Sequence, residues 1–269
     1  MGRGWVLALL ALVVVIVSIS ALFVTLKQRV ETKQQRMDES TVSTQTHSPV
    51  ITERVDFTTD DGVEIVGDYT HVDRSRFAGI LLHAIPATRQ SFSGLTKQLA
   101  RAGWSTLAID LRGHGDSLNS AKGKLDYQAF SETDHQATVF DVVAASRFLE
   151  SKGFDQSHQF LVGASIGANL ALQFLSEHRE VRAAVLLSPG LNYHGLQAEP
   201  LLRDDIGEQV MLVATEEDAY AFQTVTALHA KAKRSELVTY PIGGHGTEIF
   251  DRQSTLIPQL ISWLKGKVL

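Results

Sequence analysis

The chain of 269 residues contains no cysteine. Disulfide bonds, thiolate metal sites and a cysteine nucleophile are therefore excluded. Proline is scarce, with six residues, and hydrophobic residues make up 44% of the chain, which argues for a packed globular body and against a disordered chain. A chain of this length buries enough apolar surface to fold without disulfides, so the lack of cysteine does not identify the cellular compartment.

The chain also has fewer positively charged residues than negatively charged ones, 25 against 30. Residues 1–50 carry five of the 25 Lys and Arg and three of the 30 Asp and Glu, which leaves the rest of the chain with a net charge of −7. An acidic body without a basic stripe is repelled by phosphate backbones, which argues against nucleic-acid binding. The sequence has no H-E-x-x-H metal motif and no G-x-G-x-x-G or G-x-x-x-x-G-K-[ST] nucleotide loop. We therefore expect neither a metal nor a cofactor.

One long hydrophobic run is present, at residues 5–26, and its only polar members are Ser18, Ser20 and Thr25. At about 1.5 Å per residue, a helix of this length reaches about 33 Å and spans a hydrocarbon core of about 30 Å. A cleavable signal peptide has a shorter apolar core and a clearer small-residue cleavage site. We therefore expect an uncleaved transmembrane anchor within residues 1–26, with a removed signal peptide as the alternative.

Residues 27–50 are polar and without periodicity, which predicts a linker. Only Arg3 and the α-amino group precede the hydrophobic run, whereas four cations follow it: Lys27, Arg29, Lys33 and Arg36. The positive-inside rule would keep the following domain in the cytoplasm. A single N-terminal apolar segment is, however, the usual form of an export signal, and we expect the domain to lie outside the cytoplasm.

From residue 51 onward, predicted strands alternate with predicted helices. A hairpin about Asp61 and Gly62 comes first. The strands that follow are 78–84, 104–110, 158–163, 181–188, 209–215 and 236–241, and the helices are 91–103, 131–153, one from Ile166, 219–233 and one from Thr247. This alternation predicts an α/β fold with a mostly parallel eight-stranded sheet and helices on both faces.

Ser165 stands in "FLVGASIGANLALQF", where an apolar run meets an amphipathic one, within a G-x-S-x-G pattern. Such a tight strand-to-helix turn strains the serine backbone and needs small neighbours, and the helix N-terminus favours developing negative charge. The pattern alone is weak, and an ordinary tight turn is the other interpretation. Its place between a buried strand and a helix makes Ser165 a candidate nucleophile.

A serine nucleophile needs a base, and the base needs an orienting carboxylate. His245 in "PIGGHGTEIF" follows the last predicted strand, at the same carboxyl edge as Ser165. Asp218 follows strand 209–215 and is the candidate carboxylate, with Glu216 and Glu217 as rivals. An exposed loop histidine and a solvated acidic loop are the alternative interpretations.

The order Ser165, Asp218, His245 is associated with α/β-hydrolases. Together with "ILLHAIPATRQSF" and "LAIDLRGHGDS", it makes residues 51–269 resemble the α/β-hydrolase superfamily. The resemblance spans the whole segment after the linker. It implies the α/β-hydrolase fold, a serine hydrolase with a nucleophile elbow and catalytic triad, and no cofactor.

The resemblance also implies an oxyanion hole built from the N–H groups of Ile166 and Ile85. Ala84 stands where relatives usually have glycine, and its own N–H is the alternative donor. His83 is expected to brace this loop. The resemblance implies a hydrogen-bonded loop beside the site, not catalysis, for Arg112, His114 and Asp116.

Lids in this superfamily are often inserted after the strand that here ends at Ser188, yet only about 20 residues precede the next strand. We therefore expect no large cap and a shallow or open pocket. Its candidate lining residues are Phe92, Leu191, Tyr193 and Tyr220.

These observations predict a membrane-anchored serine hydrolase that cleaves small-molecule carboxylic esters through an acyl-enzyme. A peptidase, thioesterase or lipase would use the same triad. A non-catalytic binding protein on the same fold is the alternative of a different class.

Overall fold

In the computed structural model of the chain, residues 27, 29 and 50–268 are described. The chain divides into two units, Met1–His47 and Ser48–Leu269. The predicted anchor at residues 5–26 lies outside the described residues, as does nearly all of the predicted linker. Within the described part, no helix combines the length and apolar character needed to cross a membrane.

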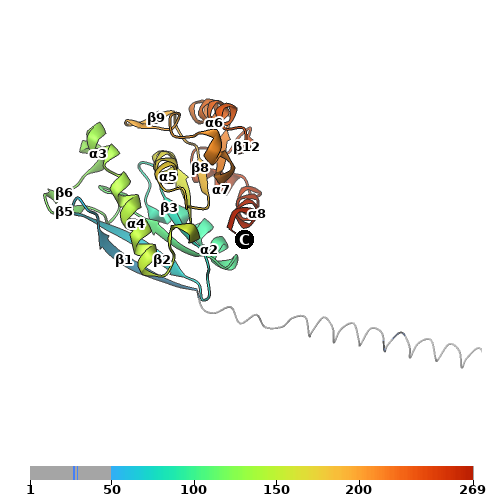
Figure 1. Cartoon of the computed structure of the whole chain (residues 1–269), viewed down its shortest axis with the longest axis horizontal. Coiled ribbons are helices and arrows are strands. Elements are labelled where there is room, and N and C mark those ends of the chain that lie inside the picture. Colours follow the sequence, from blue (N-terminus) through green and yellow to red (C-terminus); the bar gives the residue numbers. More distant parts are fainter. Residues whose placement is uncertain (1–26, 28, 30–49, 269) are drawn as a thin grey trace, which may run out of the picture. The chain divides into compact units, whose positions relative to one another are not determined.

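A ten-stranded sheet forms the centre of the second unit, in the order β12-β11-β8-β7-β3-β4-β2-β5-β6, with β1 paired to β2 (Figure 1). The six strands from β4 to β12 run parallel, and β2 joins them in the antiparallel direction. The strands of this sheet are β1 (Ile51–Thr58), β2 (Val63–His71), β3 (Ala78–Leu82), β4 (Ser105–Ile109), β5 (Asn119–Ser120), β6 (Gly123–Lys124), β7 (Gln159–Ala164), β8 (Ala184–Leu187), β11 (Val210–Thr215) and β12 (Glu236–Tyr240).

The predicted count of eight strands was therefore too low by two. All eight predicted strands are present, and the additional pair is the short hairpin β5–β6, which extends the sheet beside the start of β2. Two-residue strands leave no periodic pattern in a sequence, because an alternation of side chains needs several residues to be visible.

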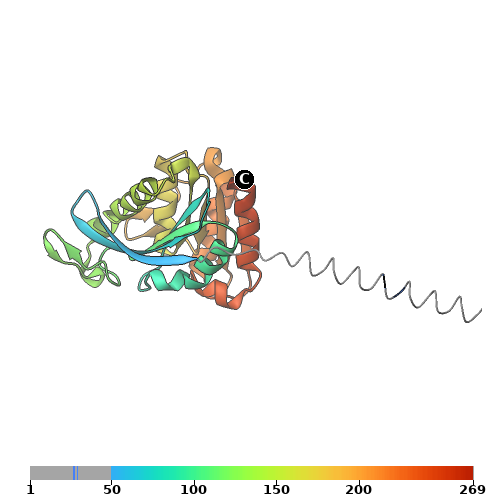
Figure 2. The same cartoon turned by 90° about the horizontal axis from the view of Figure 1, so that it is seen from below.

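Helices cover both faces of the sheet, as predicted. The helices are α2 (Ser93–Arg101), α3 (Glu132–Gln136), α4 (Val139–Ser151), α5 (Ile166–Glu177), α6 (Ala219–Lys231), α7 (Glu248–Arg252) and α8 (Leu256–Val268). Apolar residues of α4, α5 and α6 pack in one core cluster, and those of α2, α7 and α8 pack in the other. Figure 2 shows α4 and α2 on opposite sides of the strands.

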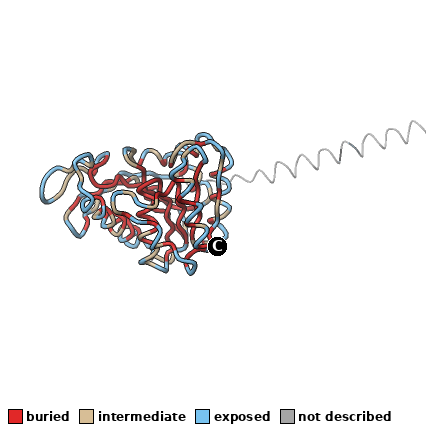
Figure 3. The backbone as a smooth tube through the Cα atoms, turned by 90° about the horizontal axis from the view of Figure 1, so that it is seen from above, coloured by how far each residue is buried: buried red, intermediate tan, exposed pale blue. Residues whose placement is uncertain are grey.

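Burial on both faces explains the continuous apolar runs of the central strands. In β3, Ile80 and Leu82 belong to one core cluster, whereas Leu81 between them belongs to the other. A strand covered on both sides needs apolar residues at every position, so it shows no polar alternation. Figure 3 shows these strands as the buried centre of the domain, with exposed loops around them.

Two predicted helices are each divided into two. Ser131 caps a helix as expected, with a capping box to Asp134, but that helix is the short α3, and α4 begins separately. The side chain of Asp141, in the first turn of α4, accepts hydrogen bonds from the backbone N and Nε of Arg112, both at 2.8 Å, which fixes where α4 starts. The C-terminal helix is divided at Gln253, whose side-chain amide donates to the Ile242 carbonyl at 2.6 Å.

Candidate active site

Ser165 lies at the turn from β7 into α5, at the carboxyl edge of the parallel strands. Its backbone angles, φ 55° and ψ −119°, lie outside the regions that side-chain-bearing residues usually adopt. The backbone N–H of Ser165 donates to the Leu187 carbonyl at 2.8 Å, which ties the turn to β8. The turn therefore has the strained form that the G-x-S-x-G pattern predicts.

Close packing around the turn requires glycine at both glycine positions of the pattern. A Cβ atom on Gly163 would lie 2.1 Å from the carbonyl oxygen of Gly167. A Cβ atom on Gly167 would lie 2.2 Å from the carbonyl oxygen of Leu82, at the end of β3. The first turn of α5 thus sits directly against the ends of two strands, and no larger residue fits at either position.

His245 and Asp218 form a close pair. His245 Nδ1 lies 2.5 Å from Asp218 Oδ2. Asp218 also caps α6, because its Oδ1 accepts a hydrogen bond from the Ala221 N–H at 3.3 Å. The cap fixes the carboxylate, and a carboxylate at Nδ1 fixes the tautomer in which Nε2 is free to accept a proton.

The rival carboxylates do not reach the imidazole. Glu217 accepts hydrogen bonds from the backbone N–H groups of Gly243, at 2.7 Å, and Gly244. These bonds hold the pKa of Glu217 below its usual value. Glu216 is exposed. Glu217 therefore anchors the loop that carries His245, a role that sequence reasoning missed because the contact spans two separate loops.

The loop of His245 borders the strand end that carries Ser165. The Gly246 N–H donates to Ser188 Oγ at 2.9 Å, and a Cβ on Gly246 would lie 3.3 Å from the Cβ of Ala164. No hydrogen bond joins Ser165 Oγ to His245 among residues 50–268. Ser188, the residue that follows β8, was not among the sequence candidates, because a lone serine at a strand end carries no motif.

The two expected oxyanion donors lie on neighbouring segments. Ile166 is the first residue of α5, so its N–H has no acceptor within the helix. Ile85 lies in the loop after β3, and its N–H has no hydrogen-bond acceptor within residues 50–268. A Cβ atom on Gly167 would also lie 2.8 Å from the carbonyl oxygen of His83, which places the start of α5 against this loop. The oxyanion role of both residues stays a prediction.

His83 braces the loop, as expected. Its Nδ1 pairs with the Ala84 carbonyl at 2.8 Å, and its Nε2 accepts from the Leu111 N–H at 3.0 Å. Burial lowers the pKa of His83 to about 3. Both ring nitrogens are occupied by neutral backbone partners, so His83 is not a candidate base.

The segment after β4 forms a buried polar network. The carboxylate of Asp110 accepts from the backbone N–H groups of Arg89 and Asp116, at 2.8 and 2.9 Å, and pairs with the Arg89 guanidinium. Arg112 pairs with Asp61 and Asp141. Arg112 and Asp116 are thus held by structural partners. His114 stacks on Tyr127, with ring centroids 4.0 Å apart.

The candidate pocket residues fall in two places. Tyr193 belongs to a short hairpin, β9 (Asn192–Tyr193) and β10 (Leu196–Gln197), which forms its own two-stranded sheet, and Leu191 directly precedes β9. Tyr220 on α6 packs against Tyr193, with ring centroids 5.7 Å apart. Phe92, by contrast, has no exposed surface and packs in the core beside Phe250. Its expected place in an open pocket is therefore not supported.

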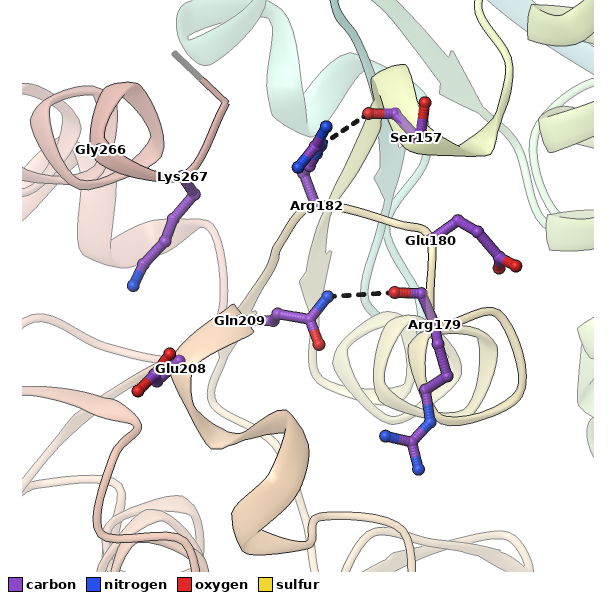
Figure 4. A pocket seen from close by; sticks show the side chains of 8 residues that line it. All are labelled: Ser157, Arg179, Glu180, Arg182, Glu208, Gln209, Gly266 and Lys267. Atoms are coloured by element: carbon purple, nitrogen blue, oxygen red, sulfur yellow. Dashed lines mark hydrogen bonds between the residues drawn. The ribbon is translucent and has the colours of Figure 1, made fainter.

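A cavity of about 510 Å³ lies at the opposite edge of the sheet. Figure 4 shows its wall, which comes from segments that precede β7, β8 and β11 and from the end of α8: Ser157, Arg179, Glu180, Arg182, Glu208, Gln209, Gly266 and Lys267. These are the amino ends of the parallel strands, whereas Ser165, Asp218 and His245 all follow carboxyl ends. No cluster of three or more His, Asp or Glu side chains suited to a metal occurs among residues 27, 29 and 50–268.

The space around Gly167 predicts a sharp contrast between two glycine substitutions. Gly167→Ala should lower the unfolding free energy by about 2–4 kcal/mol in urea titrations, because the added methyl meets fixed backbone. Gly94→Ala, on α2 with open space around it, should be neutral or stabilising by up to about 1 kcal/mol. Equal stability of the two variants would contradict this account of the turn.

The buried His83 predicts a stability loss in acid. Burial lowers the pKa of His83 to about 3. Between pH 6.5 and about pH 3, the unfolded chain therefore binds a proton at this histidine that the folded chain does not bind. This group should cost about 1.4 kcal/mol of unfolding free energy per pH unit as the pH falls from 6.5.

Urea titrations between pH 7 and pH 4 provide the measurement. His83→Asn should flatten the fall in stability over this range, whatever its stability at pH 7. His71→Asn, at an exposed histidine, is the matched control and should keep the wild-type slope. An unchanged slope in His83→Asn would show that His83 is charged in the folded protein.

A family model described as the alpha/beta hydrolase fold matches residues 80–243. An esterase from Pyrococcus furiosus is similar over 82% of this chain and 92% of its own, with a TM-score of 0.65 and 18% identity. A highly thermostable carboxyl esterase from Bacillus coagulans is similar over 82% of this chain and 100% of its own, with a TM-score of 0.62 and 13% identity.

A predicted CIB-like hydrolase from Thermoplasma acidophilum is similar over 81% of this chain and all of its own, with a TM-score of 0.62 and 14% identity. No curated protein sequence matches the chain. Identities this low establish a shared fold alone. The family model, however, covers more than half of the chain and includes the Ser165 turn and Asp218. This protein therefore belongs to the α/β-hydrolase fold family.

Proposed function

We propose that this protein is a serine hydrolase that cleaves carboxylic esters through an acyl-enzyme. The observation that carries the proposal is the pairing of His245 Nδ1 with Asp218 Oδ2 on a loop that borders the strained Ser165 turn. An oriented imidazole next to a serine at a helix N-terminus is the arrangement that activates a hydroxyl.

In the proposed reaction, Ser165 Oγ attacks the ester carbonyl carbon while His245 Nε2 takes its proton. Asp218 holds the imidazolium through Nδ1. The N–H groups of Ile85 and Ile166 stabilise the negative charge on the carbonyl oxygen. His245 then gives the proton to the leaving alcohol as the bond from the carbonyl carbon to the alcohol oxygen breaks. In the second half of the reaction, His245 takes a proton from a water molecule that attacks the acyl-enzyme, and it returns that proton to Ser165 Oγ as the acid product leaves.

Support for an ester substrate comes from two sides. Solved structures that share this fold carry the names esterase and carboxyl esterase. The segment after β8 holds only the short β9–β10 hairpin and a 3₁₀ turn, Asp204–Gln209, and not a large lid. A peptidase, thioesterase or lipase would need the same triad, and a non-catalytic binding protein would need none of it.

Ser165→Ala should abolish fluorophosphonate labelling and reduce hydrolysis of p-nitrophenyl acetate by about 10³-fold or more. Asp218→Asn should reduce hydrolysis by about 10³- to 10⁴-fold, because the imidazole loses its orienting carboxylate. Both rates are measured against Ser151→Ala, at an exposed serine on α4, which should behave as wild type.

Labelling that persists in Ser165→Ala would refute Ser165 as the nucleophile. A folded wild-type protein that neither labels nor hydrolyses activated esters of any acyl length would favour the binding protein. A panel of acyl esters, thioesters and peptides separates the remaining enzyme classes.

We also propose that residues 5–26 anchor the hydrolase domain to a membrane, with the domain outside the cytoplasm. The apolar composition of that segment supports the proposal.

The full chain should remain in the membrane fraction after alkaline carbonate extraction, and a chain lacking residues 1–26 should be released with its esterase activity intact. Protease added outside the cell should reach the domain of the full chain. Recovery of the full-length chain in the soluble fraction, or a mature N-terminus near residue 27, would contradict the anchor.

A further inference from the structure

A second serine with a strained backbone lies next to the Ser165 turn. Ser188 directly follows β8, is fully buried and has a φ of 50°. Glycine adopts such an angle without cost, whereas a residue with a Cβ atom is destabilised there. The conformation therefore favours glycine at this position, and the presence of serine points to a use for the hydroxyl.

The end of β8 contacts both the nucleophile turn and the loop of the candidate base. The Leu187 carbonyl accepts a hydrogen bond from the Ser165 N–H at 2.8 Å. Ser188 Oγ, on the next residue, accepts from the N–H of Gly246 at 2.9 Å. Gly246 directly follows His245. Two successive residues of one strand end therefore connect the backbone of the nucleophile to the backbone of the loop that carries the imidazole.

The segment that carries Ser188 is itself firmly held. The Ser188 N–H donates to the Val213 carbonyl on β11 at 2.8 Å. Two residues later, the side chain of Asn169 on α5 donates to the Gly190 carbonyl at 2.8 Å and accepts from the Gly190 N–H at 3.1 Å. The same amide donates to the Leu196 carbonyl at 2.7 Å, which fastens the β9–β10 hairpin to α5. The Ser188 hydroxyl is thus presented from a fixed support.

The loop of His245 is held from two sides. On the side of β11, Glu217 and Thr215 bond to the two glycines that precede His245. On the other side, the Gly246 N–H has Ser188 Oγ as its only acceptor within residues 50–268. Glycine before and after the imidazole gives this backbone several accessible conformations, so the bonds at its two ends select one of them.

We propose that Ser188 is a positioning residue, which sets the place of His245 relative to Ser165. It acts through the loop backbone. With its bond in place, the imidazole meets the nucleophile in one orientation. Without it, the glycine-flanked loop takes several orientations, and only some bring His245 Nε2 within reach of Ser165 Oγ. The inference rests on the proposed function, because the two residues that it relates belong to the proposed triad.

Ser188→Ala removes the hydroxyl and keeps the Cβ atom. Fluorophosphonate inactivation should show kinact reduced by about tenfold with KI unchanged, because proton transfer depends on the orientation of the imidazole and inhibitor binding does not. Ser188→Gly removes the hydroxyl and also relieves the backbone strain. It should lose kinact to the same extent, although it should unfold at a higher urea concentration than Ser188→Ala.

Ser105 provides the matched control. It is fully buried at the start of β4, on the opposite edge of the sheet, and its Oγ accepts from the Val72 N–H at 3.1 Å. Ser105→Ala therefore removes the same kind of bond far from the site. It should unfold at a lower urea concentration than wild type and keep the wild-type kinact. An equal loss of kinact in Ser105→Ala and Ser188→Ala would assign the effect to general loosening and overturn the inference.

Proton NMR gives a readout that is independent of the rate. In wild type, the proton between His245 Nδ1 and Asp218 should give a sharp downfield resonance, and the Gly246 amide should exchange slowly with solvent. Ser188→Ala should broaden that resonance and speed that exchange, and Ser105→Ala should change neither. If Ser188→Ala does not fold, Ser188→Gly is measured in its place.

A wild-type kinact in the folded variant, or a reduced kinact with an unchanged resonance, would overturn the role of Ser188. The outcome for the proposed function is read separately. Labelling that persists in Ser165→Ala refutes the proposed function. Loss of labelling in Ser165→Ala, together with a wild-type kinact in the Ser188 variants, refutes this inference alone.

Discussion

The close approach of helix α5 to the end of strand β3 is the constraint on which the site depends. The Leu82 carbonyl occupies the place where a side chain on residue 167 would be, and the Gly167 carbonyl does the same for residue 163. Only a strained residue between them lets the chain reverse from strand to helix, and that residue is Ser165. The same contact brings the first N–H groups of α5 against the loop after β3, so the position of the hydroxyl and that of the candidate oxyanion donors have one cause.

Buried charges hold the loops around this contact. The Asp110 carboxylate joins the loop after β3, through Arg89, to the loop after β4, through the Asp116 N–H. Arg112 connects the loop after β4 to α4 through Asp141 and to the first hairpin through Asp61. Removing such charged groups from water costs free energy, and this cost is offset only when every partner is in place. They therefore favour one arrangement of the loops over its alternatives more than they add to overall stability.

Elements that leave a local pattern can be predicted from the sequence, whereas elements set by contacts between distant segments cannot. Strands β3, β4, β7, β8 and β11 are predictable because coverage on both faces demands apolar runs. The places of Ser165 and Asp218 at strand ends are predictable because each follows such a run, and His245 follows the edge strand β12, while the catalytic roles of all three stay a prediction. The short strands β5 and β6 and the break between α3 and α4 depend on contacts between distant segments. The contributions of Asn169, Ser188 and Glu217 have the same origin, since each bonds to the backbone of a loop at least 20 residues away. Phe92 was misplaced because an aromatic residue after a predicted oxyanion loop has the same local pattern in a pocket and in a core.

The fastening of the β9–β10 hairpin has a consequence for how a substrate would enter. Helices α5 and α6 both bond to the hairpin, and His194 at its tip stacks on His135 of α3, with ring centroids 4.0 Å apart. A segment attached to three helices does not swing aside on its own, unlike the mobile flap of an interfacial lipase. For the proposed serine hydrolase, a hairpin held in this way predicts turnover that follows the concentration of dissolved monomeric substrate and does not rise at an oil–water surface.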